Sequence, residues 1–342
     1  MMPTTQTEST ARVQNSRAPR SKLKELQAPI RGKLDDVSAE MGRLVSSELP
    51  LVGQVSAHLL AMRGKMFRPT LLLLSSEVSG TSRPEAISLA ACLELIHLAT
   101  LVHDDAVDHS ALRRGMPTVN SLFGHQISVI MGDFLYSTAL TRLVGIGNIP
   151  ALDALTRAST EMTLGEMRQL GVTSPLGFTE DEYYALIRSK TGSLMRAACE
   201  LGALSGAEAH REALGIFGEN LGMAFQITDD LMDYLEAKET TGKPAGLDLR
   251  EHKVTLPLVF TLRRASEGAR REIEKVFGTS DPMERDIARV VQIVGDSGGF
   301  EYSRSCGESY ASRARDALSG VPDTVARAAL YASISYVMER HA

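Results

Sequence analysis

Two copies of one acidic pattern lie inside apolar, helix-forming sequence, and they constrain the fold more than any other feature. The first is Asp104-Asp105-Ala106-Val107-Asp108 and the second is Asp229-Asp230-Leu231-Met232-Asp233. Residues four apart in a helix share one face, so each pattern crowds like charges together. The apolar flanks indicate carboxylates that line a cavity, where cations neutralise them; two solvated acidic faces are the less favoured alternative. Oxygen ligands suit Mg²⁺ better than Zn²⁺.

Composition and charge exclude several classes of protein. The 342 residues are 43% hydrophobic, enough for one large domain or two ordinary ones, and the formal net charge of −5 argues against a nucleic-acid partner. Cys92, Cys199 and Cys306 lie far apart without a CxxC pair, which fits a reducing compartment. No apolar run approaches the ~20 residues that span a bilayer, so we expect a soluble, cytoplasmic protein without a transmembrane segment.

Helix-forming segments dominate the chain from Leu23 onward. Ala, Leu, Glu, Met and Arg recur there at three- and four-residue spacing, and alternating β-branched runs are nearly absent. We therefore predict one all-α domain of many antiparallel helices over residues 23–342. Residues 1–22 are predicted to be a disordered tail, because they lack an amphipathic apolar stripe, although their composition also suits a transit peptide.

Basic residues near the acidic patterns suit a diphosphate ligand. Arg113 and Arg114 follow the first pattern, where its helix is expected to end at Gly115 and Pro117. Guanidinium groups beside a metal-binding acid cluster match the geometry of a diphosphate. Further candidates are Lys65, Arg68, His97, Lys190, Thr191, Gln226, Lys243 and Lys253. Each alone is more typical of a solvated surface group or a satisfied core histidine, but their joint occurrence with two acid clusters favours a site for metal and diphosphate.

One ordered set of motifs covers nearly everything after the N-terminal tail. Besides the two acidic patterns it contains Gly64-Lys65-x-x-Arg68-Pro69, Glu94-Leu95-Ile96-His97, Arg113-Arg114-Gly115-x-Pro117-Thr118, Gly132-Asp133, Lys190-Thr191, Gln226, Gly246-x-Asp248-Leu249 and Lys253-Val254-Thr255-Leu256-Pro257. This set resembles the trans-isoprenyl diphosphate synthases (polyprenyl synthetases) of medium- or long-chain type. The resemblance implies the isoprenoid synthase type I fold, a helical barrel or bundle around a deep central cavity, and a homodimer.

The resemblance also implies a role for each matched residue. Asp104, Asp108 and Asp229 would hold Mg²⁺, about three ions per active site, on the diphosphate of an allylic substrate. Asp105 and Asp233 would support them, and Asp230 completes the expected catalytic set. Arg113, Lys190, Thr191, Gln226, Lys243 and Lys253 match positions that bind the allylic diphosphate, whereas Lys65, Arg68, His97 and Arg114 match positions that bind isopentenyl diphosphate. Arg63 stands where the family commonly has Gly, and Met66 stands where it commonly has Arg. Both departures lie on the side for isopentenyl diphosphate, so they bear on the affinity for that substrate and not on the reaction class.

The implied reaction condenses isopentenyl diphosphate with an allylic diphosphate to give a trans-polyprenyl diphosphate. Residues 242–246 would form a lid over the diphosphate, or an ordinary turn. Ala99 and Thr100 replace aromatic residues that close the cavity after short products in this family, so we expect a product of about C30 to C50, unless Ala99 only packs against a bulky neighbouring helix. The deeper tunnel would have its floor at Leu93, Ile96, Leu140 and Leu143.

Other interpretations of the same motifs remain open. The chain could be the catalytic subunit of a heteromeric polyprenyl diphosphate synthase. A non-catalytic partner subunit typically loses one acidic pattern, and this chain has both. A class I terpene cyclase would carry an Asn/Ser/Glu-type second metal site, whereas the second pattern here is fully Asp-rich. A metal-storage or scaffold protein does not explain Arg113, Arg114 or Lys190.

Overall fold

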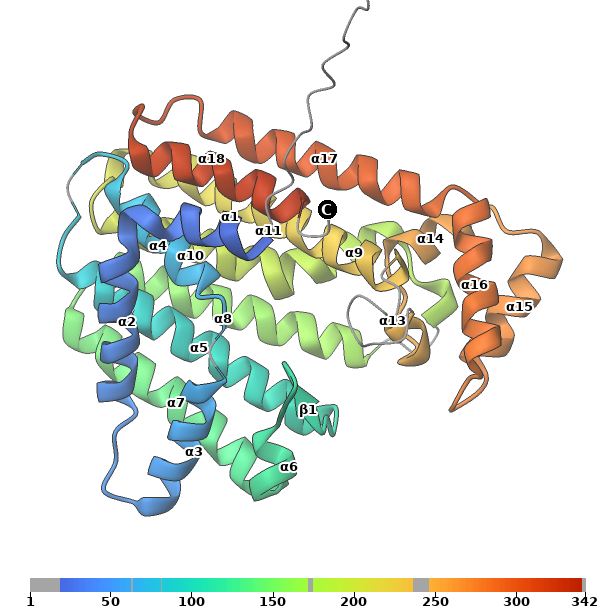
Figure 1. Cartoon of the computed structure of the whole chain (residues 1–342), viewed down its shortest axis with the longest axis horizontal. Coiled ribbons are helices and arrows are strands. Elements are labelled where there is room, and N and C mark those ends of the chain that lie inside the picture. Colours follow the sequence, from blue (N-terminus) through green and yellow to red (C-terminus); the bar gives the residue numbers. More distant parts are fainter. Residues whose placement is uncertain (1–18, 63, 81, 172–174, 236–245, 340–342) are drawn as a thin grey trace, which may run out of the picture.

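Helices form nearly all regular structure in the computed structural model, which describes residues 19–62, 64–80, 82–171, 175–235 and 246–339 (Figure 1). The first half contains α1 (Pro19–Gln27), η1 (Ala28–Ile30), α2 (Arg31–Leu44), α3 (Pro50–Ala61), α4 (Phe67–Glu77), α5 (Glu85–Val107), β1 (Leu112–Arg113), β2 (Met116–Pro117), α6 (Val119–Phe123), α7 (His125–Ile146) and α8 (Ile149–Leu170). The second half contains η2 (Pro175–Gly177), α9 (Glu180–Ile187), the π-helical turn η3 (Arg188–Gly192), α10 (Ser193–Leu204), η4 (Glu208–His210), α11 (Arg211–Leu235), α13 (Leu247–Arg250), α14 (Leu256–Leu262), α15 (Glu267–Phe277), α16 (Glu284–Asp296), α17 (Gly299–Ala317) and α18 (Val325–Met338). The all-α prediction is confirmed.

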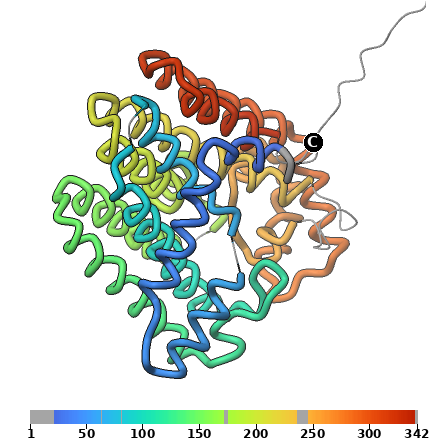
Figure 2. Tube along the Cα trace, turned by 60° about the vertical axis from the view of Figure 1, so that its left-hand side comes forward, coloured from blue at the N-terminus to red at the C-terminus, as the bar shows by residue number. Residues whose placement is uncertain are grey.

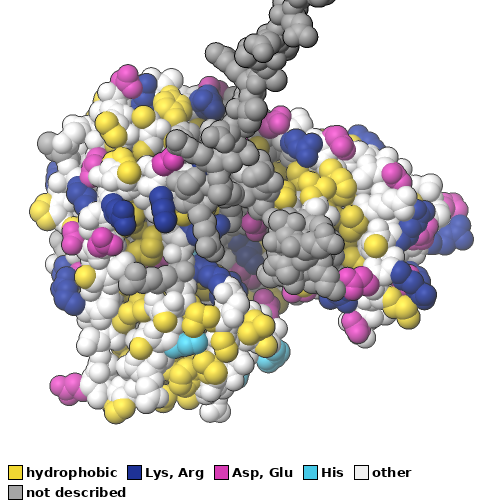
Figure 3. Space-filling view, in the orientation of Figure 1, with side chains coloured by type: hydrophobic (Ala, Val, Ile, Leu, Met, Phe, Trp, Pro, Cys, Tyr) yellow, Lys and Arg dark blue, Asp and Glu magenta, His cyan; other side chains and the backbone are white. Residues whose placement is uncertain are grey.

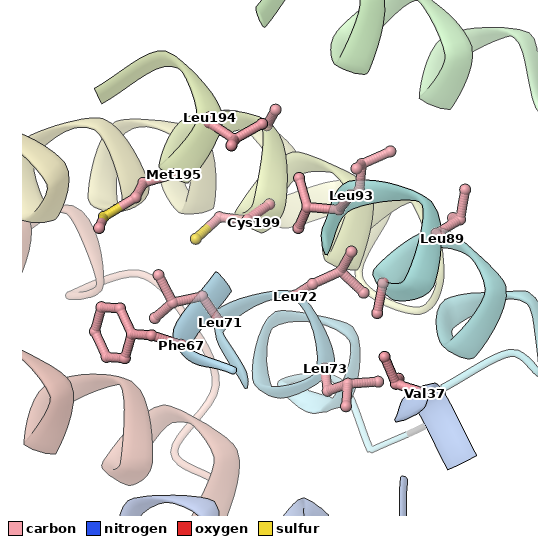
Figure 4. Packing of buried hydrophobic residues seen from close by; sticks show 14 of the residues in the cluster. Val37, Phe67, Leu71, Leu72, Leu73, Leu89, Leu93, Leu194, Met195 and Cys199 are labelled. Atoms are coloured by element: carbon pink, nitrogen blue, oxygen red, sulfur yellow. The ribbon is translucent and has the colours of Figure 1, made fainter. Parts of the chain in front are cut away.

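Helix α4 lies in the centre of the main core. Leu71–Leu74 have no exposed surface, and because successive residues in a helix are about 100° apart, these four leucines bury every side of α4. Figure 4 shows Leu72 beside Leu93 of α5, and Leu73 beside Val37 of α2. Burying each leucine contributes about 1.5–3 kcal/mol. This packing fixes α5, which carries the first acidic pattern, against the rest of the bundle.

The long helices connect the two acidic patterns through shared neighbours. Helix α5 packs on α4 and α7, while α10 packs on α4, α8 and α11, and α11 packs on α17. Figures 1 and 2 show α17 and α18 along one edge of the molecule, and α3 and α6 at the opposite edge. A second apolar cluster holds α13 to α16 together through Leu249, Leu258, Ile273 and Val290. The site residues therefore lie on helices whose apolar faces are packed in a common core.

The end of the first acidic helix differs from the prediction. Helix α5 ends at Val107 and not near Gly115 and Pro117, and β1 and β2 form a short antiparallel hairpin there. The reason is local: His109, Arg114 and Gly115 have positive φ angles of 51°, 53° and 78°, which an α-helix cannot contain. Arg113 consequently lies on a strand and not at a helix end.

The N-terminal helix boundary and two long apolar helices differ from what the sequence predicts. Helix α1 begins at Pro19, ahead of the boundary predicted at residue 23, and residues 1–18 lie outside the described part. Helices α5 and α7 are long and apolar enough to cross a membrane by length and composition, which the search for uninterrupted apolar runs missed. Within their most apolar windows, α5 is 61% buried and α7 is 28% buried. A core helix of a folded domain passes the same test, and α5 is one.

Candidate active site

The first acidic pattern lies at the C-terminal end of helix α5. Two of its aspartates face outward, and the third binds an arginine. The Asp108 N–H donates to the Asp104 carbonyl oxygen at 2.8 Å, which keeps this pair on one face of the last turn. Asp105 points the other way and is only 4% exposed. Both oxygens of its carboxylate accept from Arg113 Nε, each at 2.8 Å. Asp105 therefore fixes Arg113, while Asp104 is partly exposed and Asp108 is exposed.

Asp104 faces a cluster of charges from neighbouring elements. Burial, together with Glu166 of α8, raises the pKa of Asp104 to about 6, against the opposite influence of Lys190 and Arg113. Lys190 Nζ lies 2.5 Å from Glu166 Oε1 and donates to Gln169 Oε1 at 2.8 Å. Glu166 and Gln169 were not predicted, because their only signal is a pair of polar residues three apart on an amphipathic helix. Lys190 is thus held by α8 in front of the first acidic pattern.

Glycines bring two helices close to the turn η3 that carries Lys190. A Cβ atom on Gly165 of α8 would lie 3.1 Å from Lys190 Cγ. A Cβ atom on Gly222 of α11 would lie 2.9 Å from Gly192 Cα, closer than real Cβ contacts. The turn η3 therefore packs closely against both α8 and α11. A larger residue at Gly165 or Gly222 would displace it.

The second acidic pattern connects directly to the same turn. On α11, Asp229 is exposed, whereas Asp230 is 7% exposed. Asp230 accepts from Tyr183 Oη at 2.6 Å and from Gln226 Nε2 at 2.7 Å. The Gln226 side-chain oxygen in turn accepts from Thr191 Oγ1 at 2.8 Å. Burial raises the pKa of Asp230 to about 7, although both hydrogen bonds act in the opposite direction.

Asp233, at the end of the second pattern, forms hydrogen bonds with the start of helix α13. Its Oδ2 accepts the Asp248 N–H at 2.9 Å, and its carbonyl oxygen accepts the Gly246 N–H at 2.8 Å. Burial first, and then the charges of Asp230 and Asp233, raise the pKa of Asp248 to about 8. The predicted substrate residue Lys243 and most of the predicted lid, residues 242–245, lie outside the described residues.

The charge of Lys253 connects the first acidic pattern with Asp248, the residue that follows the second pattern on α13. Its Nζ pairs with Glu251 Oε2 at 2.6 Å. Although burial lowers the pKa of Lys253, the bond to Glu251 and the charges of Asp248 and of Asp108 in the first pattern raise it overall. Lys253 is therefore near Asp108 of the first pattern and near Asp248, whose N–H donates to Asp233 of the second pattern.

Acidic and basic side chains meet in one recess. Figure 3 shows them near the middle of the face, between the part that carries α3 and α6 and the part that carries α13. Across the described ranges, no three His, Cys, Asp or Glu side chains form a ready-made cation site. Mg²⁺ needs no such group, because it commonly binds one or two carboxylates and completes its shell with water and substrate phosphate. The oxygen-only set of Asp104, Asp108 and Asp229 fits this mode.

A second basic cluster lies beside a small pocket between α2, α3 and α5. Arg68 Nη1 lies 3.0 Å from His97 Nε2. Burial lowers the pKa of Arg68, and burial together with Arg68 and Arg114 lowers the pKa of His97 well below its usual value. Glu94 lies beside them, and burial raises the pKa of its carboxyl group. A neutral histidine next to two arginines leaves a cluster with net positive charge, suited to an anion.

Backbone geometry shapes this pocket, which has a volume of about 120 Å³ and is lined in part by Gly64, His97 and Arg114. A Cβ atom on Gly64 would lie 2.7 Å from Arg114 Nη1, so the close approach of that guanidinium depends on glycine. Met66 has a φ angle of 51° and precedes α4, which turns the chain between Lys65 and Arg68. Lys65 is exposed at the rim. The predicted residues for isopentenyl diphosphate are thus brought together.

The residues expected to set product length lie on α5 and α7. Ala99 is 1% exposed and belongs to the main core cluster, and Thr100 Oγ1 donates to the His97 carbonyl oxygen at 2.8 Å. Leu93 and Ile96 are fully buried in the same cluster, and Leu143 on α7 is buried there as well. Leu140 is partly buried against the cluster. Their role as wall and floor of a tunnel stays a prediction.

The raised carboxyl pKa values predict how the metal-free protein responds to pH. Asp104, Asp230 and Asp248 titrate near 6, 7 and 8 in the folded state but near about 3.9 when unfolded, so the folded protein retains protons that the unfolded chain releases. Their stabilising contribution is complete below pH ~4 and is lost as pH rises through these folded-state values. We expect the melting temperature to fall by roughly 3–6 °C between pH 6 and 8.5 without metal.

Differential scanning fluorimetry across this pH range measures the effect. Asp248→Asn, a neutral isostere at the most raised of the three carboxyls, should flatten the slope. MgCl₂ with inorganic diphosphate should flatten it further. A melting temperature that rises over the same interval would contradict the assignment of these buried acids.

Comparison with known proteins identifies the family of the chain. The polyprenyl synthetase family model matches residues 49–294. An all-trans-nonaprenyl-diphosphate synthase (geranyl-diphosphate specific) of Rhodobacter capsulatus is 38% identical over 288 residues, covering 84% of this chain and 88% of that protein. A short chain isoprenyl diphosphate synthase of Methanothermobacter thermautotrophicus is 35% identical over 293 residues, covering 84% and 90%. Heptaprenyl diphosphate synthase component 2 of Geobacillus stearothermophilus is 34% identical over 321 residues, covering 93% and 99%.

Solved structures share the fold over nearly the whole chain. A decaprenyl diphosphate synthase from Rhodobacter capsulatus has a TM-score of 0.88 at 36% identity, covering 93% of this chain and 99% of that one. A polyprenyl synthase from Caulobacter crescentus, complexed with calcium and isoprenyl diphosphate, has a TM-score of 0.87 at 34% identity, covering 94% and 98%. The fold and site thus define a prenyltransferase. This chain belongs to the polyprenyl synthetase family.

Proposed function

We propose that the protein is a Mg²⁺-dependent trans-polyprenyl diphosphate synthase that condenses isopentenyl diphosphate with an allylic diphosphate. The observation that carries this proposal is the arrangement of both acidic patterns around shared cations. Lys190 acts on Asp104, and its neighbour Thr191 is connected to Asp230 through Gln226. The charge of Lys253 acts on Asp108 of the first pattern and on Asp248, whose N–H donates to Asp233 of the second pattern. A ligand bound between the two patterns would need negative charge to pair with these cations, and a diphosphate has it.

On the allylic side, carboxylates and basic groups have different tasks. Asp104, Asp108 and Asp229 would hold Mg²⁺, which when bound neutralises charge on the departing diphosphate. Arg113, held by Asp105, and Lys190, held by Glu166, present cations to the same oxygens without having to reorganise. The protein supplies no side-chain nucleophile. Its part is to orient the diphosphate and to keep water from the carbocation that ionisation leaves.

On the other side, the pocket lined by Gly64, His97 and Arg114 would bind isopentenyl diphosphate. Arg68 and Arg114 provide permanent charge, Lys65 lies at the rim, and neutral His97 offers a ring nitrogen beside Arg68. Because this pocket and Asp104 lie along one helix, α5, the isopentenyl double bond would approach the ionised carbon from a fixed direction.

Ala99 leads us to propose a medium- or long-chain product. The side chain at position 99 lies one to two turns before the first acids on α5, and alanine there is much smaller than the aromatic ring that the family resemblance associates with short products. Ala99→Tyr is expected to shorten the dominant product by at least about two isoprene units, because the ring would block the chain at that depth. Thr100→Tyr should act in the same direction. Mass spectrometry of the dephosphorylated products measures the chain length. An unchanged distribution of product lengths in both variants would exclude positions 99 and 100 as the wall of the product tunnel.

We also propose a homodimer located in the cytoplasm. The apolar helix α7 exposes Ile130 at 66% and Val144 at 65%, and α8 exposes Met167 and Leu170, a surface that a second copy could cover. Cys92, Cys199 and Cys306 are all free thiols, which suits a reducing compartment. Size-exclusion chromatography with light scattering tests the dimer. A second candidate, the catalytic subunit of a heteromer, is favoured by the likeness to heptaprenyl diphosphate synthase component 2.

One assay tests the proposed reaction. Purified protein is incubated with MgCl₂, isopentenyl diphosphate and geranyl, farnesyl or geranylgeranyl diphosphate, and the products are sized by mass spectrometry. We expect a product of about C30 to C50 that disappears with EDTA. Failure to elongate any primer would count against a self-sufficient synthase and favour the heteromer. Cyclic hydrocarbon formed without consumption of isopentenyl diphosphate would instead identify a cyclase.

A further inference from the structure

A buried tyrosine behind the second acidic pattern belongs to none of the motifs in the sequence. Tyr183 on α9 is 1% exposed, and its hydroxyl donates to Asp230 Oδ2 at 2.6 Å. The start of α9 is fixed by a capping box in which the Glu182 carboxylate accepts the Thr179 N–H at 2.7 Å, and the Glu182 N–H donates to Thr179 Oγ1 at 3.3 Å. The ring packs with Ile187 of the same helix and with apolar residues of α11 and α14.

The hydrogen bonds of Asp230 show that its side chain points inward, toward Tyr183 of α9. Adjacent residues in a helix are about 100° apart, so Asp230 is turned inward while Asp229 is exposed. One carboxylate oxygen accepts from Tyr183 and the other from Gln226 Nε2 at 2.7 Å. With a donor on each oxygen, the carboxylate is held in one orientation, and such charge-assisted bonds are stronger than neutral ones.

The same network fixes the position of Lys190. Tyr183 and Thr191 lie near the two ends of one continuous segment, α9 and η3. Tyr183 is attached to α11 through Asp230, and Thr191 is attached to it through Gln226 at 2.8 Å. Because both ends of the segment are held to one turn of α11, the segment cannot slide along that helix without breaking the network. Lys190, which lies between these ends and pairs with Glu166, is therefore placed relative to Asp229.

We propose that the Tyr183 hydroxyl is a positioning group for the metal–diphosphate site, acting through Asp230 on the alignment of η3 with the second acidic pattern. The proposal rests on the proposed function, because it names a role within that site. Removing the hydroxyl should weaken binding of Mg²⁺ with diphosphate, while the isopentenyl pocket on α4 and α5, which shares no contact with this network, should be little affected.

Tyr183→Phe tests this, since it keeps the ring and removes only the hydroxyl. Tyr184→Phe is the matched control, because it makes the same change at the next residue, whose ring lies 5.6 Å from that of Tyr183 and 5.8 Å from that of Tyr310. We expect Tyr183→Phe to raise both the KM for the allylic diphosphate and the Mg²⁺ concentration for half-maximal rate by about 5- to 20-fold. The KM for isopentenyl diphosphate should change less than about twofold, and Tyr184→Phe should change none of these values more than that.

A double-mutant cycle with Asp230→Asn separates positioning from packing. If Tyr183 acts through Asp230, the double variant loses little more than the worse single variant. Equal increases in the KM of both substrates, additive losses, or unchanged Mg²⁺ and allylic values would overturn the proposal. If Tyr183→Phe does not fold, the same comparison is made on Asp230→Asn, which keeps the tyrosine and changes its partner.

A binding measurement distinguishes this proposal from the proposed function. The thermal shift produced by MgCl₂ with inorganic diphosphate is recorded for the unsubstituted protein, Tyr183→Phe and Tyr184→Phe. If the unsubstituted protein elongates no primer, the proposed reaction fails, but a shift that is diminished only in Tyr183→Phe still supports the positioning role. A shift of equal size in all three proteins, or no shift in any of them, overturns that role.

Discussion

Asp104→Asn and Asp229→Asn are each expected to lower kcat at least about 1,000-fold while leaving the fold intact. Asp104 is partly exposed and Asp229 is exposed, so an amide of the same size replaces either carboxylate without leaving a buried cavity. The amide cannot neutralise a divalent cation, and the loss concerns the step in which charge develops on the departing diphosphate. Because the two residues lie on α5 and α11, loss from both would show that one step needs both patterns.

The control for these variants is Asp153→Asn on α8. Asp153 is an exposed acid that pairs with Arg157 at 2.5 Å, away from the site. Its rate should stay within about twofold of the unsubstituted protein, as is usual for surface substitutions. Single-turnover kinetics with saturating MgCl₂ measures all three variants. Near-normal rates for either Asp104→Asn or Asp229→Asn would exclude that residue from the metal site.

Lys190→Met should lower kcat about 100-fold and move the pH dependence of the rate to higher pH. The lysine pairs with Glu166, and its charge opposes the two influences, burial and Glu166, that raise the pKa of Asp104 to about 6. Without that charge the pKa of Asp104 rises further. Since the metal requires the ionised carboxylate, the acid limb of the rate profile should shift upward.

Lys275→Met is the matched control for this second prediction. Lys275 on α15 pairs with Asp286 at 2.8 Å, a partly exposed lysine–carboxylate pair away from the acidic patterns. Its removal should leave both kcat and the pH profile unchanged. Pre-steady-state rates between pH 6 and 9 decide the question. A rate for Lys190→Met that falls without any shift of the acid limb would mean that Lys190 contacts substrate but does not act on Asp104.

The parts of the site that follow from charge pattern could be predicted from the sequence. Like charges four apart in apolar helices, such as Asp104 with Asp108, require neutralisation wherever the helix lies. A diphosphate requires several cations, and this requirement pointed to Arg113 and Lys190 from the sequence alone. The all-α fold followed from helical periodicity over most of the chain.

Other parts could not be predicted, for physical reasons. Glu166 and Tyr183 are single polar residues in helices, and only tertiary packing shows that one faces Lys190 and the other Asp230. The hairpin after α5 depends on positive φ angles at His109 and Arg114, which residues other than glycine seldom adopt and which sequence does not announce. Asp105 illustrates the limit most clearly, because its pattern suggests a ligand-facing acid and its surroundings make it the partner of Arg113.

The most direct test of the account is a crystal structure with MnCl₂ and inorganic diphosphate, in which anomalous scattering locates each metal ion. We predict ions bound by Asp104 and Asp108 on one side of a single diphosphate and by Asp229 on the other side, with Lys190 in contact with the same diphosphate. Metal at only one acidic pattern, or a diphosphate that contacts one pattern without the other, would contradict it.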